Sequence, residues 1–144
     1  MRRMTLVCAL AAAACSGDPV APRASLSTDR ALRYEAYTDQ LRLLLVGSLE
    51  LVVHGDSTVS GNWTIGWAPG VDSTTRVGPQ VGSGALQGRV LPDTSVWLNL
   101  NPGFVEYNVF LSGAATVKGL SGRWGYSTIA GEQGHGRFTA RYVF

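Results

Sequence analysis

Apolar and polar residues alternate with a period of two over most of the chain after residue 41, and this alternation constrains the fold more than any other feature. In the segment TVSGNWTIGW, residues 58–67, one face would carry Val59, Gly61, Trp63, Ile65 and Trp67. A period of two indicates β-strands with one buried face. Glycine, proline, asparagine and aspartate interrupt the alternation at short intervals, as tight turns between neighbouring strands require. The sequence therefore predicts an all-β, single antiparallel meander of about seven or eight strands, as a small up-and-down β-barrel or a β-sandwich.

Other segments repeat this pattern. The faces expected to be buried are Leu43, Leu45, Gly47, Leu49, Leu51 and Val53 in a first long strand; Leu86, Gly88 and Val90 facing Val96, Leu98 and Leu100 in a hairpin; and Phe138, Ala140, Tyr142 and Phe144 in the closing strand. A further strand is expected in FVEYNVFLSG, residues 104–113. The glycine-rich GEQGHG, residues 131–136, is expected to form a solvated turn before the closing strand.

Two segments do not follow the alternation. Residues 30–40, RALRYEAYTDQ, carry a weak stripe of Leu32, Ala36 and Tyr37, which fits a short N-terminal helix or an irregular lead-in. The connection from Ala68 to Gly84 is rich in Gly, Pro, Ser and Thr. Connections of this length are uncommon in compact domains and are often functional or mobile. We therefore expect it to lie at the mouth of the barrel.

The N-terminus has the layout of an export signal. Arg2 and Arg3 precede an apolar run from Met4 to Ala14, which is shorter than the roughly 20 residues that span a bilayer. The run ends in LAAAAC, and its small residues directly before Cys15 resemble the lipobox of bacterial lipoproteins. That resemblance implies lipidation of Cys15 and attachment to a membrane through the lipid. A typical lipobox has leucine three residues before the cysteine, where this chain has alanine, so a simple secretory signal cleaved near residue 14 stays open.

The expected domain organisation follows from this signal. Residues 1–14 form the signal peptide, residues 15–29 a flexible tether of small and polar residues with two prolines, and residues 30–144 a single β domain. Ser16 follows the cysteine at the position where the sorting rule of enterobacterial lipoproteins places Asp for retention at the inner membrane. The resemblance therefore implies an exported protein anchored in the outer membrane and facing the periplasm or the cell surface.

Charge and histidine content exclude several function classes. The 12 Lys and Arg against 10 Asp and Glu become 10 against 10 once Arg2 and Arg3 leave with the signal, so no basic patch for nucleic acid is expected. His54 and His135 have no partners at metal-ligand spacing, so we expect neither a metal site nor a cofactor. Glu132 with His135 could form an acid and base pair, but its glycine-rich surroundings favour a solvated turn, and His54 beside Asp56 is likewise expected where a strand end meets a turn. We expect no catalytic residues and no enzymatic activity.

A short motif, Ser-Gly-x-Trp, occurs twice, ending at Trp63 and at Trp124. Glycine inside a strand marks a bend or the close approach of another group, and a neighbouring Trp can fill the space above it. We therefore expect both motifs to be structural. They also resemble the Gly-x-Trp of lipocalin-like and avidin-like calycin barrels, in which this Trp packs under an arginine of the last strand; here that implies Arg137 or Arg141.

Two functions remain as expectations. The first is a non-enzymatic binding protein that holds a small apolar ligand in or at the mouth of the barrel, with Trp63, Trp67, Trp124 and Tyr126 as the candidate ligand-binding residues. The alternative is a structural or protein-interaction module of the cell envelope, with a filled core and exposed aromatic residues such as Trp97, Phe104 or Phe110.

Overall fold

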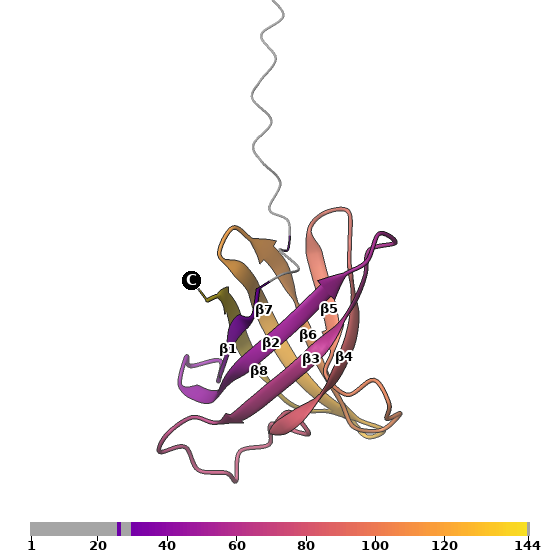
Figure 1. Cartoon of the computed structure of the whole chain (residues 1–144). Helices are drawn as coiled ribbons and strands as arrows, with labels where there is room; N and C mark the ends of the chain where they lie inside the picture. The colour runs from indigo at the N-terminus through magenta and orange to yellow at the C-terminus, as the bar shows by residue number, and fades with distance from the viewer. Residues whose placement is uncertain (1–25, 27–29, 144) are drawn as a thin grey trace, which may run out of the picture.

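The chain folds into a closed barrel of eight antiparallel strands (Figure 1). The computed structural model describes Leu26 and residues 30–143. The strands are β1 (Leu32–Tyr37), β2 (Leu43–Val53), β3 (Thr58–Trp67), β4 (Gly82–Val90), β5 (Ser95–Asn99), β6 (Asn108–Thr116), β7 (Gly119–Thr128) and β8 (Gly131–Tyr142). Each strand pairs with the next, and β1 pairs with β8 from Leu32↔Tyr142 to Tyr37↔Arg137. This closure confirms the predicted up-and-down barrel and rules out the β-sandwich.

The expectation of a short N-terminal helix or an irregular lead-in over residues 30–40 is wrong, because this segment contains strand β1. Leu32, Tyr34 and Ala36 are fully buried, while Arg33 between them is exposed. The period is therefore two. The strand is too short for this period to stand out from the sequence. Its inward side chains become buried only when β2 and β8 pair with it on either side.

The barrel interior is filled by side chains that form one continuous core. The predicted inward faces are confirmed for most positions, including Leu45, Leu49, Leu51, Val59, Trp63, Ile65, Leu86, Val96, Leu98, Phe138 and Ala140. At the start of β2 the register shifts opposite Ala36 and Tyr37, so that Leu44 is buried and Leu43 is only half-buried. This β-bulge breaks the predicted alternation at one residue.

The two ends of the barrel differ (Figure 1). One end, which we call the turn end, carries the short connections 54–57, 91–94 and 117–118 together with the start of β1 and the end of β8. The opposite end, the loop end, carries the connections 38–42, 68–81, 100–107 and 129–130. Every connection of more than four residues therefore lies at the loop end.

Two hairpins at the turn end share one turn chemistry. Asp56 Oδ1 accepts bonds from Thr58 N (3.1 Å) and Oγ1 (2.6 Å), and Asp93 Oδ1 accepts the equivalent bonds from Ser95 (3.0 and 2.6 Å). These bonds hold the pKa of both aspartate carboxyls below the usual value. Each is an Asx turn, in which the aspartate side chain bonds to the main-chain N–H two residues further on.

Three predicted boundaries move. The connection that begins at Ala68 ends before Gly82, where β4 starts, and residues 104–107 belong to a loop because β6 starts at Asn108. GEQGHG is not a turn but the first half of β8, and the turn consists of residues 129–130. Gly136 needs to be a glycine because the carbonyl of Tyr37 and the Trp124 ring lie directly against it, which places it inside the sheet.

Among the described residues, none lies in a helix that is long and apolar enough to cross a membrane.

Candidate functional site

Trp63 links three strands inside the barrel. Its side chain is buried on β3, between Leu49 of β2 and Gly84 of β4 in the register of the sheet. A Cβ added to Gly84 would lie 3.0 Å from the indole ring, so the ring packs directly against the β4 backbone. Beyond β4, the indole Nε1 donates a hydrogen bond of 2.7 Å to the carbonyl of Leu100, just past the end of β5.

Trp124 repeats this arrangement on the other side of the barrel. It lies on β7, between Leu111 of β6 and Gly136 of β8, and a Cβ added to Gly136 would lie 2.7 Å from its Nε1. The Nε1 donates a bond of 3.0 Å to the carbonyl of Tyr37 at the end of β1. Each tryptophan thus passes beneath one strand and bonds to the next. The repeated sequence motif is therefore a structural element that joins strands.

The glycine of each motif serves the same purpose. A Cβ added to Gly61 would overlap the carbonyl oxygen of Glu50, and one added to Gly122 would overlap that of Ser112. Adjacent strands therefore approach closely only because these positions lack a side chain. The structural interpretation of the motif agrees with this geometry.

The arginines implied by the calycin resemblance lie elsewhere. Arg137 and Arg141 are exposed on β8 and alternate with the inward-facing Phe138 and Ala140. Trp63 and Trp124 are inside the barrel. The indole N–H groups bind main-chain carbonyls instead, so the packing of each Trp is explained without an arginine above it.

The connection 68–81 closes the loop end from within. Val77 and Gln80 are buried, and the Gln80 side chain donates to the Val77 carbonyl (2.7 Å) and accepts a bond from the Tyr34 hydroxyl (3.1 Å). Gly78 has a φ of 68° and packs against the Tyr126 ring. The predicted position at the barrel mouth is confirmed. The segment does not lie open, because the buried Gln80 side chain bonds it to Tyr34 in the core.

Burial raises the pKa of the Tyr34 hydroxyl far above its usual value. Above about pH 10, where an exposed tyrosine ionises, the unfolded chain loses this proton and the folded chain keeps it. Stability supplied by this group is therefore complete below pH 10 and falls as the pH rises toward the folded pKa. We expect urea unfolding between pH 8 and 11 to show a steeper loss of stability for the natural protein than for Tyr34→Phe. Equal slopes would contradict the burial of this hydroxyl.

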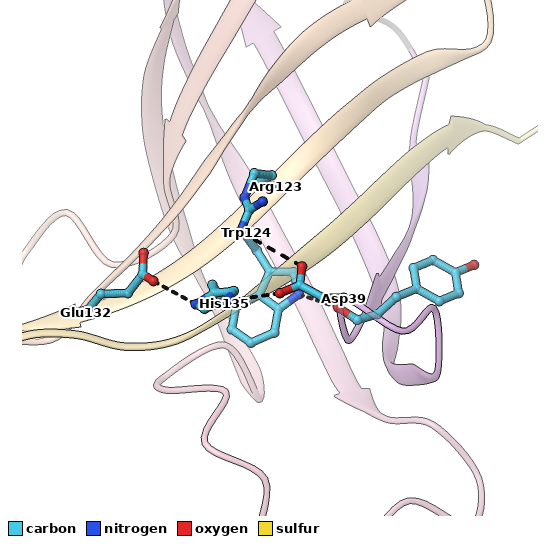
Figure 2. A network of polar contacts seen from close by, with 6 residues as sticks. Asp39, Arg123, Trp124, Glu132 and His135 are labelled. Atoms are coloured by element: carbon cyan, nitrogen blue, oxygen red, sulfur yellow. Dashed lines mark hydrogen bonds and ion pairs between the residues drawn. The ribbon is translucent and has the colours of Figure 1, made fainter.

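A network of charged side chains lies on the outer surface where β8 extends beyond β1 (Figure 2). His135 Nδ1 lies 2.7 Å from Glu132 Oε1, and His135 Nε2 lies 2.9 Å from Asp39 Oδ2. Arg123 lies 3.9 Å from the other oxygen of Asp39. The network joins the 38–42 turn to β7 and β8. Asp39 was not predicted, because its contact depends on a turn that closes onto the last strand.

This network does not form a metal centre. Among the described residues, no group of three or more His, Cys, Asp and Glu side chains is placed to hold a metal ion. Both ring nitrogens of His135 are occupied by carboxylates, and each of these groups is partly exposed. The arrangement is typical of surface ion pairs, which join the 38–42 turn to β7 and β8 here and are weakened by solvent screening.

Two pockets lie at the loop end and contain three of the four predicted ligand-binding residues. Trp67 and Tyr126 line a pocket of about 390 Å³ together with Thr74, Thr75, Arg76, Val77, Gly78, Thr128 and Gln133. Trp63 lines a second, larger pocket of about 650 Å³, which we call the seam groove. Its other lining residues are Pro79, Val81, Gly82, Ser83, Gly84, Ala85, Leu100, Asn101, Pro102, Gly103, Phe104 and Tyr107. Trp124 lines neither pocket.

The fold and its surface define a closed eight-stranded antiparallel barrel with a filled interior, and two of its surface pockets lie at the loop end. Comparison with protein-family models, with curated proteins and with solved structures finds no match to this chain.

Proposed function

We propose that this protein is a non-enzymatic interaction module of the bacterial cell envelope, anchored by a lipid on Cys15, which binds a partner protein through its loop end. The observation that carries the proposal is the contrast between a filled interior and an apolar loop end. Residues Leu49, Leu51, Ile65, Leu98 and Leu100 are all buried in the core. A ligand inside the barrel would have to displace them, and this favours the interaction module over a binding protein with an internal cavity.

Each of the four connections at the loop end exposes at least one large apolar side chain. These are Leu41, Val81, Phe104, Val105 and Ile129, with Tyr107 beside them, and Val105 is 96% exposed. The turn end exposes two large apolar side chains on its connections, Leu91 and Val117, whereas the loop end exposes at least one on every connection. This difference favours the loop end as the protein-binding surface. Trp97 and Phe110, also expected to be exposed, stack on each other at 5.3 Å on the outside of the wall, and Trp97 is 43% exposed.

The orientation of the barrel supports the same proposal. The signal peptide (1–14) and the tether (15–29) lie outside the described residues, apart from Leu26, which packs against the core. Strand β1 begins at the turn end. A lipid on Cys15 would therefore attach the domain to the membrane from its turn end, which leaves the loop end free to meet a partner.

A photoreactive residue tests this proposal in intact cells. We expect substitution at Phe104, on the loop end, to give protein crosslinks that are absent when the same residue replaces Val117, which is 78% exposed on the turn end. N-terminal mass spectrometry of the same preparation should find the lipid on Cys15.

Crosslinks from position 117 alone would contradict binding through the loop end. No crosslinks from either position, together with saturable quenching of tryptophan fluorescence by an apolar ligand that is lost in Trp67→Phe, would favour a small-ligand site in the Trp67 and Tyr126 pocket instead. An unmodified N-terminus would contradict the anchor.

A further inference from the structure

The barrel wall is only partly closed between β4 and β5. Strand β4 pairs with β3 along nearly its whole length, from Ile65↔Gly82 to Thr58↔Arg89. It pairs with β5 only from Gln87↔Asn99 to Val90↔Val96. The first five residues of β4, Gly82 to Leu86, therefore have a strand partner on one side and none on the other. We call this stretch the open edge.

The direction of the hydrogen bonds shows which groups of the open edge are unpaired. Val90 N–H bonds to Ser57 on the β3 side (2.9 Å), and Leu91 N–H bonds to Ser95 on the β5 side (2.8 Å). Main-chain groups of successive residues alternate between the two sides of a strand. Counting back by twos from Leu91, Ser83 and Ala85 direct their N–H and C=O groups to the β5 side. Within residues 30–143, no partner strand meets those groups.

The equivalent place between β8 and β1 is covered by the chain itself. There, β8 also extends beyond its pairing with β1, which ends at Tyr37↔Arg137. The carboxylate of Asp39 contacts His135 across this place (Figure 2). Arg76 of the 68–81 connection reaches Gln133 at 3.4 Å. Among the described residues, none covers the open edge of β4 in this way, and the edge faces the seam groove.

The opposite wall of the seam groove is held in a fixed shape. Asn101 Nδ2 donates to the Tyr107 carbonyl (2.7 Å), Phe104 N–H donates to the Asn101 carbonyl (3.3 Å), and Asn108 Nδ2 donates to the Val105 carbonyl (3.2 Å). This wall presents Phe104 and Tyr107, which are 61% and 52% exposed. The groove residues include no charged side chain. A preformed groove avoids the ordering cost of binding.

We propose that the open edge binds an extended, uncharged segment of a partner protein as an added β-strand. This inference rests on the proposed function and names the kind of partner. Only another main chain presents donors and acceptors in alternation to match those of Ser83 and Ala85. The added segment continues the line of β5, runs antiparallel to β4 and spans about five residues. Its apolar side chains, at alternate positions, pack against Leu100, Phe104 and Tyr107.

Two variants of one exposed residue provide the test. Ala85→Pro removes the N–H that faces the groove and leaves the bonds toward β3 in place, whereas Ala85→Ser keeps the N–H. The probe is a phage library of short linear peptides, selected on the full-length chain. We expect the selected peptides to bind Ala85→Pro about tenfold more weakly or worse, and to bind Ala85→Ser as they bind the natural protein.

A second measurement reads the main-chain bonds directly. Peptide binding should slow hydrogen exchange at the Ser83 and Ala85 amides in the natural protein, and methylation of alternate peptide nitrogens should abolish binding. Equal binding to both Ala85 variants would overturn the strand addition, as would selection of no peptide. If the crosslinks from position 104 persist in Ala85→Pro, the proposed function stands without strand addition; if position 104 gives no crosslinks in the natural protein, the proposed function itself fails.

Discussion

Replacing Trp63 or Trp124 with alanine is expected to lower the free energy of unfolding by about 3–5 kcal/mol. Each substitution removes a buried ring that packs against the backbone of a glycine on the adjacent strand, and also removes the N–H bonded to Leu100 or Tyr37. The carbonyl that loses its donor adds to the cost of the cavity. Urea unfolding of the purified protein, followed by circular dichroism, gives the measurement.

Trp97→Ala serves as the control, because this tryptophan lies on the outer face of β5, is partly exposed and stacks on Phe110. We expect it to cost about 1 kcal/mol. Because Trp63 and Trp124 occupy equivalent places on opposite sides of the barrel, their two alanine variants should lose similar amounts. Stability like that of the natural protein in both would contradict the structural role of the repeated motif.

Gly61→Ala and Gly122→Ala are expected to destabilise the barrel by about 3 kcal/mol or more, although each adds only one methyl group. The new Cβ would overlap a main-chain carbonyl oxygen of the preceding strand, Glu50 in one case and Ser112 in the other. A backbone atom cannot rotate away as a flexible side chain can, so the strands must separate locally. Thermal unfolding of each variant measures the effect.

Gly66 on the same strand as Gly61 provides a matched control. A Cβ added to Gly66 would have no other atom within 4 Å, and Gly66 does not have a positive φ. Gly66→Ala should therefore be neutral or slightly stabilising, since alanine reduces the freedom of the unfolded chain. If Gly61→Ala matched Gly66→Ala, the close approach of β2 and β3 at Gly61 would be disproved.

The sequence predicts those parts of the fold in which several alternating residues follow one another. Strand β3 is the clearest case, because Val59, Gly61, Trp63 and Ile65 follow one another at every second position and the three apolar side chains are all buried. Strand β1 could not be identified, because Leu32, Ala36 and Tyr37 in this short segment also fit a helical stripe. The number of strands and the barrel closure follow once β1 is included.

The candidate site was only partly accessible to sequence analysis. Trp67 and Tyr126 were predicted and lie in one pocket, but nothing local marks Ser83, expected in the loop, or Ala85, expected at the start of a strand, as residues with unpaired main-chain groups. Their unpaired groups depend on where β5 ends, and that end is set by the departure of the chain at Leu100. Likewise, Asp39 meets His135 only through the closure of β1 onto β8. Such features belong to the assembled sheet.

The pairing of β1 with β8 also determines when this domain can form. The first strand of the barrel waits for the last, since Leu32 pairs with Tyr142 near the C-terminus. Contacts between residues so far apart in the chain slow folding, because a long loop must close before they form. Until β8 is in place, β1 and β7 each keep one unprotected edge, and unprotected edges join readily with those of other chains. A chain that loses even its final strand would therefore be a source of aggregation rather than a smaller working domain.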